Sequence, residues 1–225
     1  MENMDHLSDS FAPTKDELPP AQRFQFAMDR RKFLQLTGGG LVVVFALRDF
    51  LSPEDNITVA ETGDVPVTEV GAWIHIGKDG KVTVYTGKVE VGQNIRTSLS
   101  QMVAEELMVP ISSITMIMGD TDLVPYYRGT YGSLTTPQMA PQLRKAAATA
   151  REALLNMAAK NWNTPASDLK AEDGMIVSNT GNKKISYGEL TKGQQLLMPI
   201  ADKVQLIAAK DWKVAGKTVA RINDR

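Results

Sequence analysis

Two short segments of the sequence carry residue types that could bind an anionic, oxygen-rich ligand. Residues 90–94 read Glu-Val-Gly-Gln-Asn, and residues 129–136 read Gly-Thr-Tyr-Gly-Ser-Leu-Thr-Thr. Each segment places glycines, hydroxyl groups or a side-chain amide just before an expected helix. Backbone N–H groups and the positive end of the helix dipole favour negative charge there, and glycine allows a ligand to approach closely. The pattern alone leaves equal room for two capped helices without a ligand.

The composition limits the chemistry of this chain. Its 225 residues suffice for one or two domains, and its 43% hydrophobic and 23% charged residues are typical of a folded protein. A net charge of −1 and the lack of a basic stripe give no reason to expect a nucleic-acid partner. The sequence contains no cysteine and only His6 and His75. We therefore expect no iron–sulfur cluster, c-type haem or Cys/His zinc site in this chain, and any redox chemistry must use a non-covalent cofactor or another chain.

The first 47 residues are predicted to be a leader with a twin-arginine export signal. A polar, acidic stretch precedes Arg30-Arg31, Phe33-Leu34 follows, and residues 36–47 are apolar with three glycines. Twelve helical residues span about 18 Å, less than a hydrocarbon core of about 30 Å. The pattern therefore favours a signal and a periplasmic location over a transmembrane anchor. No clean cleavage site follows, so an uncleaved leader would act as a membrane tether; the alternative is an ordinary amphipathic helix with a basic start.

The remaining sequence predicts a linker over residues 48–69 and a folded part over residues 70–225. An Asp79-Gly80 turn joins two alternating segments and predicts a β-hairpin. Helices are expected from residue 95 to about Met108 and after Thr136-Pro137, which reads as an N-cap and first-turn pair. The other expected elements are strands at 114–118, 169–171 and 175–177, a short helix at 186–190 and a polar tail. This predicts an α+β fold in which mixed small sheets pack with two main helices, and two strand–helix pieces bring both glycine segments to the same end of the sheet.

Two adjacent carboxylates, Glu105 and Glu106, lie near the end of the first expected helix. Paired carboxylates can act as a general acid and base, but adjacent helix residues point in different directions. We therefore expect Glu105 and Glu106 to be solvated and to play no catalytic role.

Six motifs, in this order, resemble one protein family. They are Gly-Lys-x-Glu-x-Gly-Gln at 87–93, Ala-Glu-Glu-Leu-x-Val-Pro at 104–110, Gly-Asp-Thr at 119–121, Gly-Thr-x-Gly-Ser-x-Thr-Thr at 129–136, an alanine-rich helix at 146–159 and Ser-Tyr-Gly-Glu-Leu at 186–190. The order is similar to that in the N-terminal part of the molybdopterin-binding large subunit of the xanthine oxidase family. The nearest branch is that of the isoquinoline oxidoreductase beta subunit and periplasmic aldehyde dehydrogenases. The resemblance implies that residues 70–225 form a partial molybdopterin-binding domain.

The resemblance implies positions for the cofactor. The residues near the pterin would be Gly92, Gln93, Thr130, Gly132, Ser133, Thr135 and Thr136. Tyr131 would face the molybdenum side, near the substrate. The sequence departs from the family at Asn94, where glycine is usual, and at Leu134, where arginine is common. The family's glutamate base lies beyond the matched region, so no catalytic residue is expected in this chain.

The resemblance also implies a function. The chain would be the N-terminal component of a split molybdenum hydroxylase that oxidises aldehydes or N-heterocycles, sharing its molybdopterin with a chain that carries the remainder of the large subunit. An iron–sulfur small subunit would accept the electrons, in some members passing them to a c-type cytochrome. Activity is expected only in the assembled enzyme. The alternatives are a non-catalytic accessory or binding protein of the same fold, or a truncated remnant without function.

Overall fold

The computed structural model describes residues 40–46, 70–124, 127, 129–191, 195–201 and 203–222. Within these residues a five-stranded sheet has the order β4-β3-β2-β1-β8. Its strands are β1 (Gly40–Ala46), β2 (Val70–Gly77), β3 (Val82–Thr86), β4 (Ile114–Met118) and β8 (Gln195–Pro199). The predicted hairpin is confirmed, because β2 and β3 pair antiparallel across the Asp79-Gly80 turn. β3 and β4 pair parallel, and so do β1 and β8.

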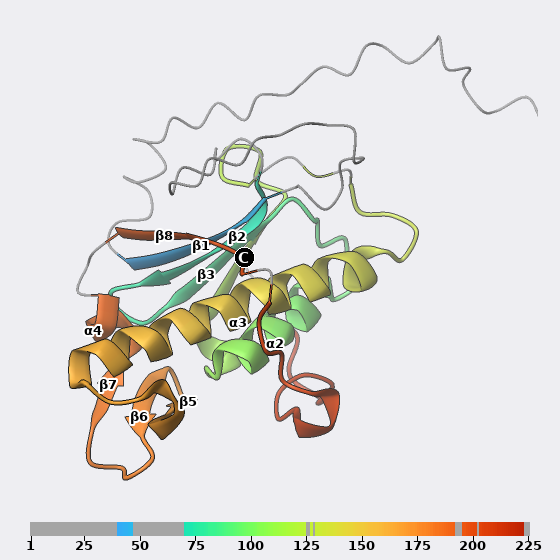
Figure 1. The fold of residues 1–225 in the computed structure, drawn as a ribbon. Helices are drawn as coiled ribbons and strands as arrows, with labels where there is room; N and C mark the ends of the chain where they lie inside the picture. The colour runs from blue at the N-terminus through green and yellow to red at the C-terminus, as the bar shows by residue number, and fades with distance from the viewer. Residues whose placement is uncertain are drawn as a thin grey trace, which may run out of the picture.

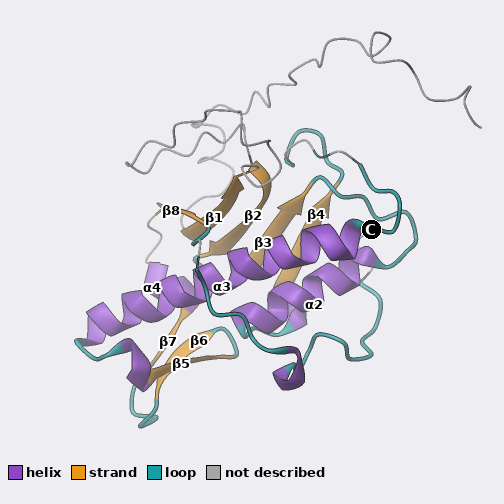
Figure 2. Cartoon of the chain, turned by 45° about the vertical axis from the view of Figure 1, so that its right-hand side comes forward, coloured by secondary structure: helices purple, strands orange, loops and turns teal. Residues whose placement is uncertain are grey.

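Two long helices cover one face of this sheet. α2 (Ile95–Leu107) and α3 (Thr135–Trp162) lie side by side below the strands, with β3 and β4 above them (Figures 1 and 2). The apolar positions of α2 recur at helical spacing and are buried in one core with the inward side chains of the sheet. That core includes Ile74, Ile76, Val82, Val84, Ile95, Leu99, Val103, Leu107, Ala146, Ala147, Ala150 and Leu154. The small alanine side chains of α3 allow its backbone to lie close to its neighbours.

A second, three-stranded sheet lies below one end of α3. It consists of β5 (Leu169–Glu172), β6 (Met175–Ser178) and β7 (Lys184–Ser186), and it leads into the short helix α4 (Tyr187–Thr191). Ser186 and Glu189 cap α4 reciprocally, since Glu189 Oε2 accepts from the Ser186 N–H at 3.0 Å and Ser186 Oγ accepts from the Glu189 N–H at 3.2 Å. A Cβ atom on Gly188 would lie 2.2 Å from the carbonyl oxygen of Lys78, so only glycine fits against that turn. The Ser-Tyr-Gly-Glu-Leu motif is thus explained by packing. The α+β class with two main helices is confirmed.

The strand β1 was not anticipated. The sequence assigns the apolar residues 36–47 to the leader, whereas residues 40–46 form a strand inside the sheet between β2 and β8, with Leu41 fully buried. The run Val42-Val43-Val44-Phe45 has the β-branched and aromatic composition that suits a strand. The described fold therefore extends N-terminal to residue 70. The paired arginines and residues 47–69 lie outside the described residues.

The expectation that Glu105 and Glu106 are solvated is wrong, because the polar tail packs over α2 and buries both. Glu105 Oε2 accepts from the N–H groups of Lys213, Val214 and Ala215 at 2.9, 2.6 and 2.9 Å. Glu106 faces the other way, and its carboxylate pairs with Arg144 at 2.7 Å and Arg151 at 3.0 Å. The side chains of Glu105 and Glu106 point in different directions, as predicted.

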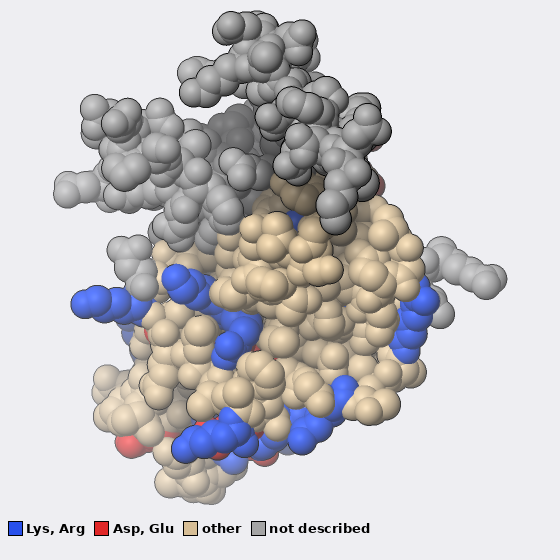
Figure 3. All heavy atoms as spheres, turned by 90° about the vertical axis from the view of Figure 1, so that its right-hand side faces the viewer, with Lys and Arg blue, Asp and Glu red and all other residues tan. Residues whose placement is uncertain are grey.

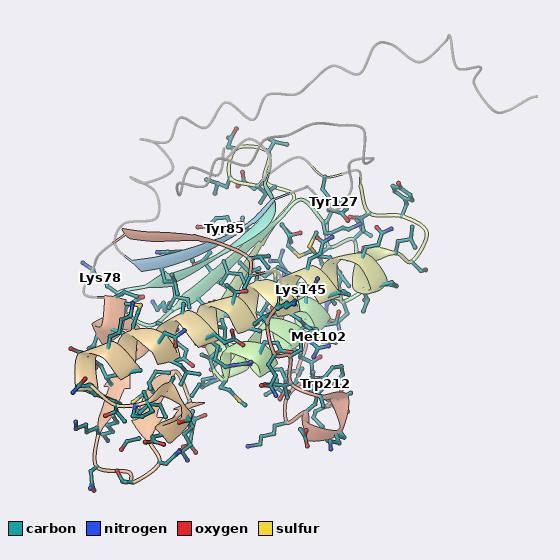
Figure 4. All side chains as sticks on the ribbon, viewed as in Figure 1. Lys78, Tyr85, Met102, Tyr127, Lys145 and Trp212 are labelled. Atoms are coloured by element: carbon teal, nitrogen blue, oxygen red, sulfur yellow. The ribbon has the colours of Figure 1, made fainter. Side chains whose placement is uncertain are left out.

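The segment over α2 includes the short 3-10 turn η5 (Ala209–Asp211) and is held at several points along that helix. Trp212 lies beside α2 in Figure 4, and Gln101 Nε2 donates to the carbonyls of Val214 and Lys217 at 2.8 Å each. Ile222 N–H donates to Thr97 Oγ1 at 3.0 Å. Two further 3-10 turns, η3 (Ile111–Ser113) and η4 (Ala166–Asp168), precede β4 and β5. Among the described residues no helix is long and apolar enough to cross a membrane.

Candidate functional site

The topology brings the two glycine segments together. β3 and β4 are parallel neighbours, so the chain leaves both strands at the same edge of the sheet before entering α2 and α3. We call residues 87–94, between β3 and α2, the first loop, and residues 129–134, before α3, the second loop. This edge lies at the N-terminal end of α3, on the right of Figure 1. The predicted placement of both segments at one end of the sheet is confirmed.

Two hydrogen bonds join the loops directly. The Val89 N–H donates to Thr130 Oγ1 at 2.9 Å, and Lys88 Nζ donates to the carbonyl oxygen of Gly129 at 2.8 Å. The Lys88 ammonium also lies 4.2 Å from the centroid of the Tyr127 ring. Burial lowers the pKa of Lys88. The loops are therefore one connected structure, fixed by a lysine and a threonine hydroxyl.

The first loop is organised around the carboxylate of Glu90. Its Oε1 accepts from the N–H groups of Gly92 at 2.7 Å and Asn94 at 3.0 Å, and its Oε2 accepts from the N–H of Arg96 at 3.0 Å. Burial raises the pKa of Glu90, but these three N–H groups and the guanidinium of Arg221 outweigh that effect and hold the pKa below its ordinary value. Glu90 therefore supplies the negative charge at the start of α2.

Gly92 and Gln93 form the exposed tip of this loop. Gly92 has φ +104°, with open space where a Cβ atom would lie. Gln93 Oε1 accepts from the Val91 N–H at 2.7 Å, and its Nε2 donates to the Val89 carbonyl at 2.9 Å, so its amide is held within the loop. Asn94 has φ +64°, which asparagine tolerates better than most residues. The loop therefore has a left-handed residue at Asn94, the position where the family resemblance led us to expect glycine.

The second loop leads into a helix whose N-terminus differs from that of α2. Gly132 and Ser133 both have positive φ, +63° and +55°. Within the described residues, α3 has no acidic residue in its first turn and no side-chain cap. The predicted Thr136 cap is therefore wrong: the N-cap is Leu134, and the helix already begins at Thr135. At the start of α3, Pro137 has no N–H group and the Leu134 N–H donates to the Tyr131 carbonyl, which leaves the N–H groups of Thr135 and Thr136 for an anion. At the start of α2, Glu90 already accepts from the N–H groups of Asn94 and Arg96.

The predicted cofactor residues do not all face the same surroundings. Tyr131, Gly132, Ser133 and Thr136 are exposed, Thr130 is half-buried beside the first loop, and Thr135 is buried at the start of α3. Gly92 and Gln93 are exposed on the first loop. Sequence reasoning missed the parts played by Lys88 and Glu90, although both lie in the Gly-Lys-x-Glu-x-Gly-Gln motif. The sequence shows that both residues are charged, but their hydrogen-bond partners are set by the folded backbone.

Several large apolar side chains are exposed on the two loops. Among the described residues, the exposed large hydrophobic side chains are Val89, Val91, Tyr131 and Leu134, and Val91 is 76% exposed. All four belong to the two loops. Figure 3 looks at this side of the molecule, and most of the described surface there is uncharged, with Lys and Arg in separate groups toward its edges. Exposed apolar residues gathered at one place indicate a surface that another molecule covers.

The residues present fit a bound pterin-type cofactor. A glycine tip with open space, a helix N-terminus without a side-chain cap, and a buried lysine beneath the loops suit a large anionic ligand held by backbone and amide groups. The described residues contain no cluster of three His, Asp or Glu side chains suited to holding a metal ion. The backbone and amide groups of the two loops suit the organic part of such a cofactor.

Comparison with known proteins agrees with this interpretation. The family model of the molybdopterin cofactor-binding domain matches residues 40–223. The chain belongs to this family, within the molybdenum-binding subunits of the xanthine oxidase group.

Three relatives illustrate the similarity. The chain is 34% identical over 194 residues to a nicotinate dehydrogenase subunit of Pseudomonas putida, covering 86% of this chain and 16% of that protein. It is 31% identical to the beta subunit of isoquinoline 1-oxidoreductase of Brevundimonas diminuta (62% and 19% covered) and 36% identical to the molybdenum-binding subunit of xanthine dehydrogenase of Escherichia coli O157:H7 (52% and 16%). The chain thus spans less than a fifth of the length of each. The matched region begins at residue 40, where β1 begins.

Proposed function

We propose that this chain forms one wall of the molybdopterin pocket of a molybdenum hydroxylase that oxidises aldehydes or N-heterocycles. The observation that carries the proposal is the junction of the two glycine loops at one sheet edge in a chain of the molybdopterin-binding family. The similar proteins named nicotinate dehydrogenase and isoquinoline 1-oxidoreductase support the N-heterocycle class. When bound, the molybdenum cofactor supplies the two-electron redox chemistry, which the side chains of this domain do not offer.

The residues of the chain have binding and positioning roles in this proposal. Gly92 and the amide of Gln93 approach the pterin from the first loop. Gly132, Ser133 and the first N–H groups of α3 receive its negatively charged part, favoured by the helix dipole. Tyr131 and the exposed valines of the loops exclude water once the pocket is closed, which strengthens the polar contacts inside it.

The exposed loops need a second protein surface to form an enclosed pocket. We propose that a chain carrying the remainder of the large subunit covers Val89, Val91, Tyr131 and Leu134, and that the cofactor is shared between the two chains. An iron–sulfur small subunit then takes the electrons, with a c-type cytochrome as their further acceptor. The names of the relatives, which are subunits, support an assembly of this kind.

A gentle isolation of the protein from its native host tests the assembly. We expect molybdenum in the preparation, together with a larger hydroxylase chain and an iron–sulfur subunit identified by mass spectrometry. Recovery of a lone, metal-free chain would contradict the proposal and favour an accessory protein or a remnant.

The proposed location is the periplasm, reached by twin-arginine export. The paired arginines Arg30 and Arg31 carry this proposal. Replacing both by lysine keeps the charge and is expected to block export, as measured by the periplasmic fraction of the protein. Normal periplasmic accumulation of this variant would contradict the assignment.

A further inference from the structure

Lys88 is a buried cation with an unusual set of neighbours. Its side chain is only 2% exposed, and its Nζ contacts the Gly129 carbonyl oxygen at 2.8 Å and the Tyr127 ring at 4.2 Å from the centroid. Among the described residues no carboxylate forms an ion pair with it. Gly129 is the first residue of the second loop and Tyr127 lies two residues before it, whereas Lys88 belongs to the first loop.

Such a lysine is a poor means of stabilising a fold. Removing an ammonium group from water carries a large free-energy cost, and an apolar side chain of similar length would avoid that cost. A role other than stabilising the fold therefore explains the position of Lys88 better. The ammonium reaches across to the backbone of Gly129, where φ is +117°, at the first residue of the second loop. One residue on, the Val89 N–H donates to Thr130 Oγ1. Consecutive residues of the first loop thus bind consecutive residues of the second.

We propose that Lys88 is a positioning residue that clamps the second loop to the first and holds both at the spacing that the cofactor site requires. The inference rests on the proposed function for the identity of the ligand, but the clamp itself can be measured without any cofactor. Because Lys88 fixes a carbonyl group, its role is to keep the second loop, and with it the entry into α3, in one arrangement before a ligand arrives.

Hydrogen exchange of the Val89 amide in the full 225-residue chain measures the clamp. Lys88→Met keeps the length of the stem and removes the donor, so exchange at Val89 should become about tenfold faster, as expected when a hydrogen bond from a charged group is lost. Lys88→Arg restores a charged donor and should bring the rate back toward that of the wild type. The matched control is Lys78→Met, an exposed lysine that Figure 4 places at the opposite end of the domain from Tyr127; it should leave the rate unchanged.

The thermal midpoint separates a clamp from a merely structural lysine. If Lys88 acts as proposed, Lys88→Met keeps or raises the midpoint, since a buried charge is replaced by an apolar group, while Val89 exchange becomes faster. An unchanged Val89 rate in Lys88→Met would overturn the proposal. So would equal acceleration at core amides such as that of Leu154, because it would indicate general destabilisation.

The link to the cofactor has its own readout. In the complex isolated from the host, Lys88→Met should carry several-fold less molybdenum than the Lys88→Arg and Lys78→Met proteins. Wild-type molybdenum content in Lys88→Met would overturn the role in cofactor binding even if the exchange rate rises. If the wild-type complex itself lacks molybdenum, the proposed function fails, while the exchange experiment still decides whether the clamp exists.

Discussion

The backbone N–H of Val89 donates to Oγ1 of Thr130 at 2.9 Å, a contact between residues 41 positions apart in the sequence. It is made possible by the parallel pairing of β3 and β4, which delivers both loops to one edge. Thr130 thus has a structural partner within the chain itself. Its hydroxyl accepts from Val89 and still has a hydrogen to donate, so it can hold the loop and face a ligand at once.

Replacement of Thr130 should loosen the loops without unfolding the domain. Thr130→Val removes the acceptor at nearly constant shape, and a net cost of about 1 kcal/mol to the local loop structure is expected. Thr130→Ser keeps the hydroxyl and serves as the control. Hydrogen exchange at Val89 should be faster in Thr130→Val and nearly normal in Thr130→Ser. Equal rates in the two variants would show that the hydroxyl does not hold the junction.

Gly132→Val tests whether the conformation of the second loop matters for cofactor binding. Gly132 has φ +63°, which costs a residue with a Cβ atom about 1–2 kcal/mol and a branched one more. Gly181→Val is a matched control, because Gly181 has φ +72° at an exposed turn of the smaller sheet. Both variants should fold with similar losses of stability. Molybdenum content of the assembled complex should fall only in Gly132→Val, and an equal content in both would refute the loop's role.

Glu106 should be essential for the stability of the fold. Its fully buried carboxylate pairs with Arg144 and Arg151 and accepts the Ile207 N–H at 3.1 Å. Glu106→Gln leaves two guanidinium groups without their anion, so a loss of about 3–5 kcal/mol in the free energy of unfolding is expected. Glu172→Gln, at an exposed pair with Lys170, is the control and should have no measurable effect. Chemical denaturation of the purified chain measures both, and a stable Glu106→Gln protein would disprove the assignment.

Most of the helices and strands followed from local patterns in the sequence. The Asp79-Gly80 turn predicted the hairpin, helical spacing predicted α2, and the strand at 114–118 was placed as observed. These elements depend on the residues of a turn and on apolar residues at regular spacing. Both can be recognised within a short stretch of sequence. The two glycine loops were also predicted, because a glycine-rich segment just before a helix can be recognised in the sequence.

The errors arose where distant segments decide the outcome. The apolar residues 36–47 are as compatible with an export signal as with a strand. Only the pairing of residues 40–46 with β2 and β8 places them in the sheet. Glu105 and Glu106 read as solvated because the segment that covers them lies about a hundred residues further on. The role of Lys88 depends on a carbonyl group in another loop, which no periodicity indicates.

Glu90 predicts a specific acid sensitivity of the first loop. Its pKa in the folded protein lies below its ordinary value, so the carboxylate's contribution is fully present above the unfolded pKa of about 4.3 and is lost as the pH falls through the lower, folded value. The amide signals of Gly92 and Asn94, both bonded to Oε1, should therefore be constant from neutral pH to about pH 5 and change only in more acidic solution. Glu90→Gln removes the titration and should give signals independent of pH over this range. A midpoint above about 4.3 for the Gly92 amide would mean that the N–H groups do not hold the anion, and that Glu90 does not supply the charge at the start of α2.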